Sequence, residues 1–353
     1  MGNYLNPGNE KFRRMIQSEI YVDKTGMIKY TNSVLDTAQN YVCVSRPRRF
    51  GKSMAANMLT AYYSCGCNSK ELFGKFEIAK DKDFEKYLNQ YNTIFLNMQE
   101  FLSRSHNVEE LIDRVKKLVI RDLKMEYPEV DYFDDTDLIE CMQDIYAQMQ
   151  YPFVVIIDEW DCIFREYKQD KEAQEKYLDF LRDLLKDKAC IYLSYMTGIL
   201  PIAKYSSGSE LNMFLEYTMA SEEKFNEYFG FTESEVDDLF QKYLEICATP
   251  MIIREQLRLW YDGYATKAGE RMYNPRSVVT ALSNNNIGNY WTSSGPYDEI
   301  FYYIKNNVAD VKADLVLMVS GEAVQAKVRE YAAASMNLST KNEIFSAMVV
   351  YGF

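Results

Sequence analysis

A single histidine and the lack of long apolar runs exclude whole classes of protein. The only histidine among 353 residues is His106, so a metal site built from imidazole and thiolate ligands is not expected. No apolar stretch approaches the roughly 20 residues that cross a bilayer, and no basic segment followed by an apolar one opens the chain. We therefore expect a cytoplasmic location and no membrane partner.

The seven cysteines form no pattern of metal ligands or of disulfides. Their number is odd, several lie inside apolar runs, and Cys65 and Cys67 lack the second pair that a zinc site needs. We expect free, reduced thiols that pack as small apolar side chains.

Positive charge is also in short supply. Lysine and arginine number 40 against 52 aspartates and glutamates, which gives a net charge of −12. Such a balance argues against a broad basic face for nucleic acid, but a local basic patch stays open, so nucleic-acid binding is left undecided. The length suits two domains, or one large domain with an appendage.

Four short apolar segments predict buried strands. They are YVCVS (41–45), TIFLNM (93–98), FVVIID (153–158) and CIYLSYMTG (190–198). Longer stretches with helical spacing lie between them. Strands that alternate with helices and lack polar alternation indicate a parallel sheet covered on both faces. We predict an α/β domain over residues 1–220.

Beyond residue 220 the pattern becomes helical. Thr232, with Glu235 three residues later, is a capping box that opens a helix. Asn274 followed by Pro275 predicts another helix start. Residues 221–353 are therefore expected to form a mainly helical, lid or winged-helix-like region.

Two further elements are expected in this region. One is a helix that is entered at Thr249–Pro250 and ends at Gly263. The other is a candidate short strand, LVLMV, at 315–319.

The segment YVCVSRPRRFGKS carries most of a phosphate-binding loop. Gly51, Lys52 and Ser53 follow the strand 41–45, and a helix is expected to begin directly after them. In such loops, backbone N–H groups at a helix N-terminus hold the phosphates, the lysine adds positive charge, and the hydroxyl ligates Mg²⁺.

Arg46 stands where this motif has its first glycine. Pro47 is expected to fix the turn instead, because its ring sets φ. Arg46, Arg48 and Arg49 form a basic cluster, for which two interpretations stay open. The arginines add charge beside the phosphates or reach a neighbouring subunit, or they form a solvated turn or a salt bridge to an acid such as Asp161.

A second motif supports the first. In YPFVVIIDEWD, the apolar residues 153–157 run into Asp158 and Glu159. In a sheet that hydrolyses nucleotides, an aspartate at a strand end holds Mg²⁺ and the adjacent glutamate polarises the attacking water. The alternative is a solvated acidic turn, which the presence of Lys52 and Ser53 makes the weaker interpretation.

These motifs resemble the AAA-ATPase-like family of bacterial proteins, which are P-loop NTPases. The resemblance rests on SRPRRFGKS, VIIDEWD and the earlier YVDKT, and continues through YMTGILPIAKYSSGSELNMF, YFGFTESEVDDLF, WYDGY, MYNPRSVVTAL and NYW. It covers nearly the whole chain, in order. It implies a parallel AAA-type sheet with helices on both faces and a mainly helical C-terminal region, and an arginine in the place of the first glycine is usual in the family.

The resemblance also implies ATP and Mg²⁺ as cofactors and a set of site residues. The residues implied to contact the nucleotide are Arg48, Arg49, Phe50, Gly51, Lys52, Ser53 and Met54. Those implied for catalysis are Lys52, Asp158, Glu159 and Thr197, with Ser53 and Asp158 on the metal. Thr197 takes the place of a γ-phosphate sensor, and a plain strand-end role is its alternative. Equal candidates for an arginine reaching a neighbouring nucleotide are Arg254, Arg258 and Arg276.

The expected function is an ATPase whose C-terminal region relays the nucleotide state to a protein effector. Two alternatives stay open: a signalling or defence scaffold that binds ATP with little turnover, and a DNA-associated regulator of a nuclease. A homo-oligomer is a candidate assembly. Family members often carry a C-terminal PD-(D/E)XK nuclease, but Glu322 and Lys327 have the wrong spacing for one, so nuclease chemistry is not expected of this chain.

Overall fold

A computed structural model describes most of the chain. The described residues are 2–18, 20–202, 211–219, 224–266, 268–290, 304, 308–325 and 340–351. Their contacts divide the chain into two compact units, which we call the sheet unit (1–44, 52–198 and 204–216) and the C-terminal unit (45–51, 199–203 and 217–353). The loop 45–51 therefore groups with the C-terminal unit, whereas the helix that follows it belongs to the sheet unit. The predicted domains, 1–220 and 221–353, stay a prediction.

A five-stranded sheet with the order β2-β3-β4-β1-β5 is the centre of the sheet unit. Its strands are β1 (Tyr41–Ser45), β2 (Asn92–Asn97), β3 (Phe153–Asp158), β4 (Ile191–Gly198) and β5 (Leu215–Thr218). β2, β3 and β4 pair in parallel. Every residue of β3 is buried, which explains its unbroken apolar sequence. The predicted parallel α/β sheet is confirmed, and the four predicted strands lie within a residue of β1 to β4.

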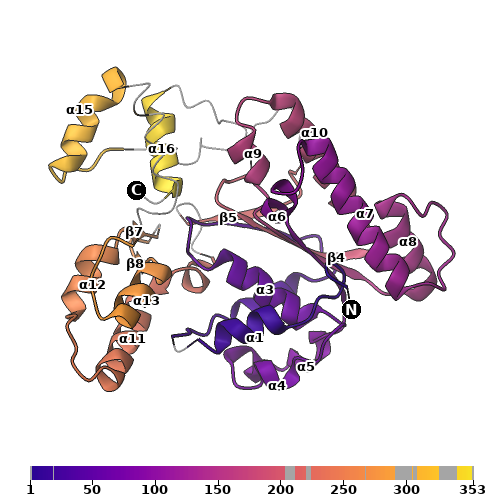
Figure 1. The fold of residues 1–353 in the computed structure, drawn as a ribbon, viewed down its shortest axis with the longest axis horizontal. Coiled ribbons are helices and arrows are strands. Elements are labelled where there is room, and N and C mark those ends of the chain that lie inside the picture. Colours follow the sequence, from indigo (N-terminus) through magenta and orange to yellow (C-terminus); the bar gives the residue numbers. More distant parts are fainter. Residues whose placement is uncertain are drawn as a thin grey trace. The chain divides into compact units, whose positions relative to one another are not determined.

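Helices lie on both sides of this sheet (Figure 1). On one side are α1 (Glu10–Ile16), α3 (Lys52–Tyr63), α4 (Lys70–Phe73) and α5 (Phe84–Tyr87), and on the other are α7 (Val108–Glu126), α8 (Leu138–Met149) and α10 (Lys171–Leu185). α3 packs against β2, β3 and β4, and α7 packs against α8 and α10. The unit also contains α2 (Met27–Val34), α6 (Met98–Leu102), α9 (Cys162–Glu166) and the 3-10 helix η1 (Glu77–Lys80).

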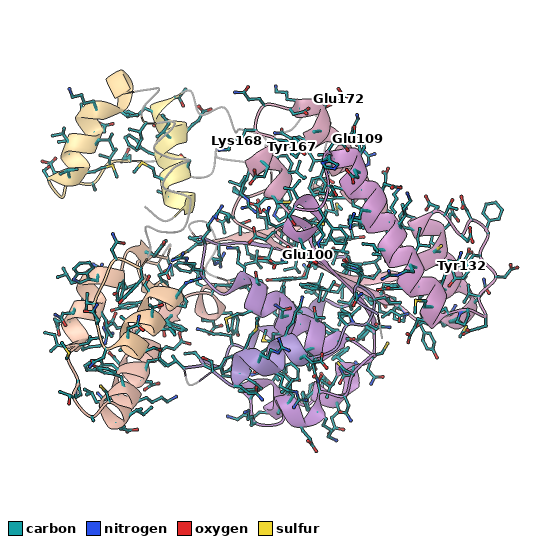
Figure 2. The ribbon with its side chains drawn as sticks, in the orientation of Figure 1. Glu100, Glu109, Tyr132, Tyr167, Lys168 and Glu172 are labelled. Atoms are coloured by element: carbon teal, nitrogen blue, oxygen red, sulfur yellow. The ribbon has the colours of Figure 1, made fainter. Side chains whose placement is uncertain are left out.

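Exposed polar contacts join the N-terminal ends of α7 and α10. Lys176 of α10 pairs with Glu109 of α7 and, at 2.8 Å, with Glu172 one turn earlier. Figure 2 shows Glu109 and Glu172 at the neighbouring ends of the two helices. The hydroxyl of Tyr167, directly after α9, donates to the carbonyl of His106 at 3.4 Å. These contacts place α9 beside the start of α7.

The C-terminal unit combines helices with a small antiparallel sheet of order β6-β8-β7. Its strands are β6 (Phe231–Thr232), β7 (Tyr264–Ala265) and β8 (Arg271–Tyr273). Its helices are η2 (Asn226–Tyr228), α11 (Glu233–Ile246), α12 (Arg254–Tyr261), α13 (Pro275–Asn284), α15 (Val308–Val319) and α16 (Lys341–Tyr351).

Both predicted helix starts in this unit are confirmed. The Thr232 hydroxyl accepts from the N–H of Glu235 at 3.3 Å, and the Glu235 carboxylate accepts from the N–H of Thr232 at 2.9 Å. The Asn274 side chain accepts from the N–H of Ser277 at 3.1 Å, with Pro275 at the first helical position.

The predicted helix entry at Thr249–Pro250 is wrong, because α12 begins only at Arg254. The N–H of Met251 donates to the hydroxyl of Tyr243 and to Oδ1 of Asn285, both at 2.9 Å. These tertiary bonds hold the segment in an extended form against α11 and α13, and they outweigh its local helical preference.

The candidate strand at 315–319 is also wrong, because these residues belong to α15. The hydrophobic periodicity of a short apolar run does not distinguish a strand from a buried helix. Length decides the matter here, since α15 extends from Val308 to Val319.

Three other expectations concern what the chain lacks. Among the described residues, no helix is long and apolar enough to cross a membrane. All seven cysteines are free thiols, as predicted. Lys327, which entered the nuclease argument, lies outside the described residues.

Candidate functional site

Lys52 is the first residue of α3, and only 5% of its side chain is exposed. Gly51 has a φ of 92°, which lets the chain turn into the helix, and no non-neighbouring atom lies within 4 Å of the place a Cβ would take. Burial lowers the pKa of Lys52 to about 8, although the carboxylates of Glu159, Asp161 and Asp158 oppose the shift. A buried amine beside an open backbone is the arrangement that a phosphate requires.

Three polar residues stand in register at the ends of neighbouring strands: Asn97 of β2, Asp158 of β3 and Thr197 of β4. Nδ2 of Asn97 donates to Oδ2 of Asp158 at 3.2 Å. Burial raises the pKa of Asp158 to about 6, and a hydrogen bond from Ser53 and the charge of Lys52 limit the rise. The structure thus brings the two predicted metal ligands, Ser53 and Asp158, into contact.

Glu159 follows in the left-handed backbone conformation, with a φ of 56°, and its N–H donates to Oδ1 of Asp158 at 3.1 Å. Its carboxylate pairs with Arg165 of α9. The side chain of Glu159 is 24% exposed, whereas those of Arg165 and Asp161 are 6% and 0% exposed. Of these two acids beside Asp158, Glu159 is therefore the one that water can reach.

The hydroxyl of Thr197 donates to the carbonyl of Val44 in β1 at 2.9 Å, and the residue is fully buried. This bond ties the end of β4 to the end of β1. The strand-end interpretation of Thr197 therefore has a structural observation behind it. Its role as a γ-phosphate sensor stays a prediction, and it requires the single hydroxyl proton to turn from Val44 to a phosphate oxygen, because a phosphate oxygen accepts and does not donate.

Arg46 is a buried structural residue, with 1% of its surface exposed. Its guanidinium donates to the carbonyl of Tyr217 at 2.7 Å and to Oδ1 of Asn226 at 3.0 Å, and lies 5.3 Å from the ring centre of Phe229. The interpretation of a solvated turn is therefore wrong for Arg46, and that of a charge beside the phosphates stays a prediction. The acid suggested for a salt bridge, Asp161, pairs with Arg165.

The next loop residues are engaged within the C-terminal unit. Arg49 has a φ of 70° and donates to the carbonyl of Tyr290. The ring of Phe50 is buried and lies 4.5 Å from that of Tyr264. The roles of Arg48, Arg49 and Phe50 at a nucleotide stay predictions, and any contact from Phe50 would come from its backbone.

Two other predicted residues, Met54 and Arg254, differ in whether their side chains are held by neighbours. Met54, in the first turn of α3, is 42% exposed. Arg254 is held within its own unit by Glu233 and Asp237, at 2.9 and 2.6 Å. Among the three candidate arginines, this engagement makes Arg254 the least suited to reach a neighbouring molecule.

Asn97 and Arg165 are site residues that the sequence reasoning did not identify. Asn97 could have been found, because it ends a predicted strand next to the one that ends in Asp158, and such ends meet at one edge of a parallel sheet. Arg165 carries no such signal. Its place depends on the sharp turn at Glu159 and on the short helix α9, neither of which the apolar pattern records.

These residues fit a nucleotide with Mg²⁺. Burial shifts both Lys52 and Asp158 toward their neutral forms, so each would gain from a bound group of opposite charge. No cluster of three or more His, Cys, Asp or Glu side chains suited to a metal occurs in the part of the chain that is described. Mg²⁺ needs no such cage, because it is commonly held by one or two protein groups together with phosphates and water.

The chain is similar to two kinds of known sequence. A family model described as "Predicted AAA-ATPase" matches residues 7–207. An uncharacterized protein from the vnfD 5′ region of Azotobacter chroococcum mcd 1 is 24% identical over 280 residues, which are 78% of this chain and 50% of that protein. The chain thus spans about half the length of this curated relative.

Solved structures give more distant similarities. The Aeropyrum pernix ORC1 protein in complex with DNA has a TM-score of 0.38 at 10% identity, covering 87% of this chain and 73% of its own. The Aeropyrum pernix ORC2 protein in ADPNP and ADP complexes has a TM-score of 0.34 at 12% identity, covering 76% and 65%. Cdc6p from Pyrobaculum aerophilum has a TM-score of 0.35 at 10% identity, covering 98% and 84%. At this distance none of them bears on function.

Arg46→Gly, which would restore the glycine of the common motif, should destabilise the protein. The change removes charged hydrogen bonds to the carbonyls of Ser45 and Tyr217 and to the buried side chain of Asn226, at a cost of about 3 kcal/mol. Urea unfolding of the two proteins measures the difference. Arg46→Lys keeps the charge but not the planar fork and should fall between them. Stability of Arg46→Gly equal to that of the unmodified protein would contradict the role given to the guanidinium.

Asp158→Asn should stabilise the nucleotide-free protein increasingly as pH rises. The folded pKa of Asp158 is raised from 3.8 to about 6, so between these values the unfolded chain ionises first and stability falls as pH rises. The stability difference between variant and unmodified protein should grow by about 2 kcal/mol from about pH 4.5 to about pH 7.5. Urea unfolding at both pH values measures it.

The control for this pH dependence is Asp134→Asn. Bonds from Thr136 lower the pKa of Asp134 from 3.8, so this carboxylate is already mostly ionised in both the folded and the unfolded chain at about pH 4.5. The stability difference for Asp134→Asn should therefore stay nearly constant between the two pH values. Equal differences at both pH values for Asp158→Asn would show that the carboxylate is not held in a desolvated place.

Proposed function

Because the chain belongs to the AAA-ATPase-like family, we propose that it binds ATP with Mg²⁺ and hydrolyses it. The observation that carries this proposal is the convergence of Lys52, Ser53 and two acids at the end of β3. The start of α3 meets the acidic end of β3 there, and phosphoryl transfer requires a positive charge and metal-holding groups at one place.

Each residue has a distinct role in this proposal. Lys52 supplies positive charge to the β and γ phosphates, and backbone N–H groups at the start of α3 add to it. Ser53 and Asp158 hold Mg²⁺, which would neutralise charge that develops on the phosphates. Glu159 accepts a hydrogen bond from the attacking water and orients it. Asn97 keeps the Asp158 carboxylate in place through the bond at 3.2 Å.

We further propose that the nucleotide state is relayed to a protein effector through the C-terminal unit. The support is that residues 45–51 group with that unit, while Lys52 and Ser53 begin a helix of the sheet unit. Arg46 fixes the first part of the loop to Tyr217 and Asn226. A rearrangement of the loop around the phosphates would therefore reach Tyr217 and Asn226.

Glu159→Gln should keep nucleotide affinity and lose turnover by a factor of roughly a hundred or more, because the amide cannot accept a proton from water. ATP hydrolysis and binding of a fluorescent ATP analogue measure the two properties. Lys52→Ala is the companion variant and should lose the binding itself. Full turnover by Glu159→Gln together with unchanged affinity of Lys52→Ala would refute the proposed site.

A further inference from the structure

Arg165 occupies an unusual position for a residue outside the expected motifs. It lies on α9, a short helix that starts three residues after Glu159; Figure 2 labels Tyr167 and Lys168, which directly follow this helix. Its side chain is 6% exposed, and Nη2 donates to Oε2 of Glu159. A long, charged side chain is thus buried beside the acid that is proposed to orient the attacking water.

A second acid forms an ion pair with the guanidinium. Oδ2 of Asp161 lies 3.4 Å from Nε of Arg165, and Asp161 is fully buried. The N–H of Arg165 also donates to the carbonyl of Asp161, at 3.3 Å. Arg165 is therefore tied to Asp161 through both its backbone and its side chain.

The fold makes specific room for this arrangement. Gly198 ends β4, and a Cβ at this position would lie 2.6 Å from Oδ1 of Asp161 and 2.8 Å from the indole of Trp160. Only a glycine lets Asp161 and Trp160 pack so closely against the end of β4. The turn that carries Arg165 is thus packed directly against the end of β4.

The carboxylate of Glu159 needs such a support. Its backbone is in the left-handed region, with a φ of 56°. Its side chain has three rotatable bonds and is 24% exposed to solvent, so it can adopt several rotamers. Arg165 contacts one carboxylate oxygen, and a carboxylate has about four lone-pair positions, so the other oxygen keeps its capacity to accept from water. Catalytic side chains whose rotamers are fixed by neighbours lose less rate to misorientation.

We propose that Arg165 is a positioning residue for Glu159, with Asp161 as its anchor. This inference rests on the proposed function, because it takes Glu159 to be the acid that orients water. Arg165 touches neither nucleotide nor water in this account. It holds the Glu159 carboxylate in place through the contact between Nη2 and Oε2.

Arg165→Met tests the proposal. The value of kcat for ATP hydrolysis should fall by roughly ten- to a hundredfold, as for other supporting contacts to reactive groups, while KM and the affinity for a fluorescent ATP analogue stay within a factor of about three. Arg165→Lys keeps the charge and should recover part of kcat, but not all of it, because an ammonium lacks the planar fork. Should Arg165→Met fail to fold, Arg165→Lys supplies the same test.

The decisive comparison is made in the Glu159→Gln background. If Arg165 acts through Glu159, adding Arg165→Met there should lower kcat no further. In the nucleotide-free protein, the thermal shifts caused by the two changes should likewise be less than additive, which checks the pair without any turnover. Arg182→Met is the matched control: Arg182 pairs with exposed acids on α10, and its removal should leave kcat and KM unchanged.

The outcomes separate the two proposals. Unchanged or faster turnover of Arg165→Met overturns the positioning role, and faster turnover would identify Arg165 as a restraint on Glu159. A further loss of kcat in the Glu159→Gln background overturns it too, because Arg165 would then act by another route. If Glu159→Gln alone hydrolyses ATP normally, the proposed function fails before Arg165 is considered.

Discussion

The burial of charge where β3 meets α3 is the constraint on which the site depends. Lys52 and Asp158 are both nearly removed from water, and in both the pKa moves toward the neutral form. Their mutual attraction therefore does not fully offset the loss of hydration. A protein keeps such a group of charges at a cost in stability, which is the usual condition of a site arranged for a ligand and not for folding.

Rigid elements hold these charges in place. Parallel pairing sets Asn97, Asp158 and Thr197 in one row, so a hydrogen bond across strands can orient the carboxylate of Asp158. The turn after β3 then brings Glu159 and Asp161 to the same edge with Arg165 between them. Positions that follow from strand register need little further support, whereas the side chain of Glu159 depends on contacts from α9.

Periodicity and two motifs were enough to predict the sheet and the centre of the site. The apolar runs before Lys52 and Asp158 gave the strands, and the alternation with helices gave the parallel pairing. Periodicity and motifs could not predict the features that tertiary hydrogen bonds and backbone turns determine. The extended entry to α12 depends on Tyr243 and Asn285, and the place of Arg165 depends on the backbone turn at Glu159. The direction in which Arg46 points was likewise hidden, because a basic cluster in a loop usually indicates a solvated or ligand-facing surface.

The buried arginine has a mechanical consequence. A loop that begins with glycine can pivot about one residue, and small displacements are then absorbed locally. In this chain the corresponding position is rigid, because Arg46 donates to Tyr217 and Asn226 and packs on the ring of Phe229. A displacement of the loop by a ligand is therefore transmitted to Tyr217, Asn226 and Phe229. In motifs that begin with glycine, the same displacement is absorbed within the loop.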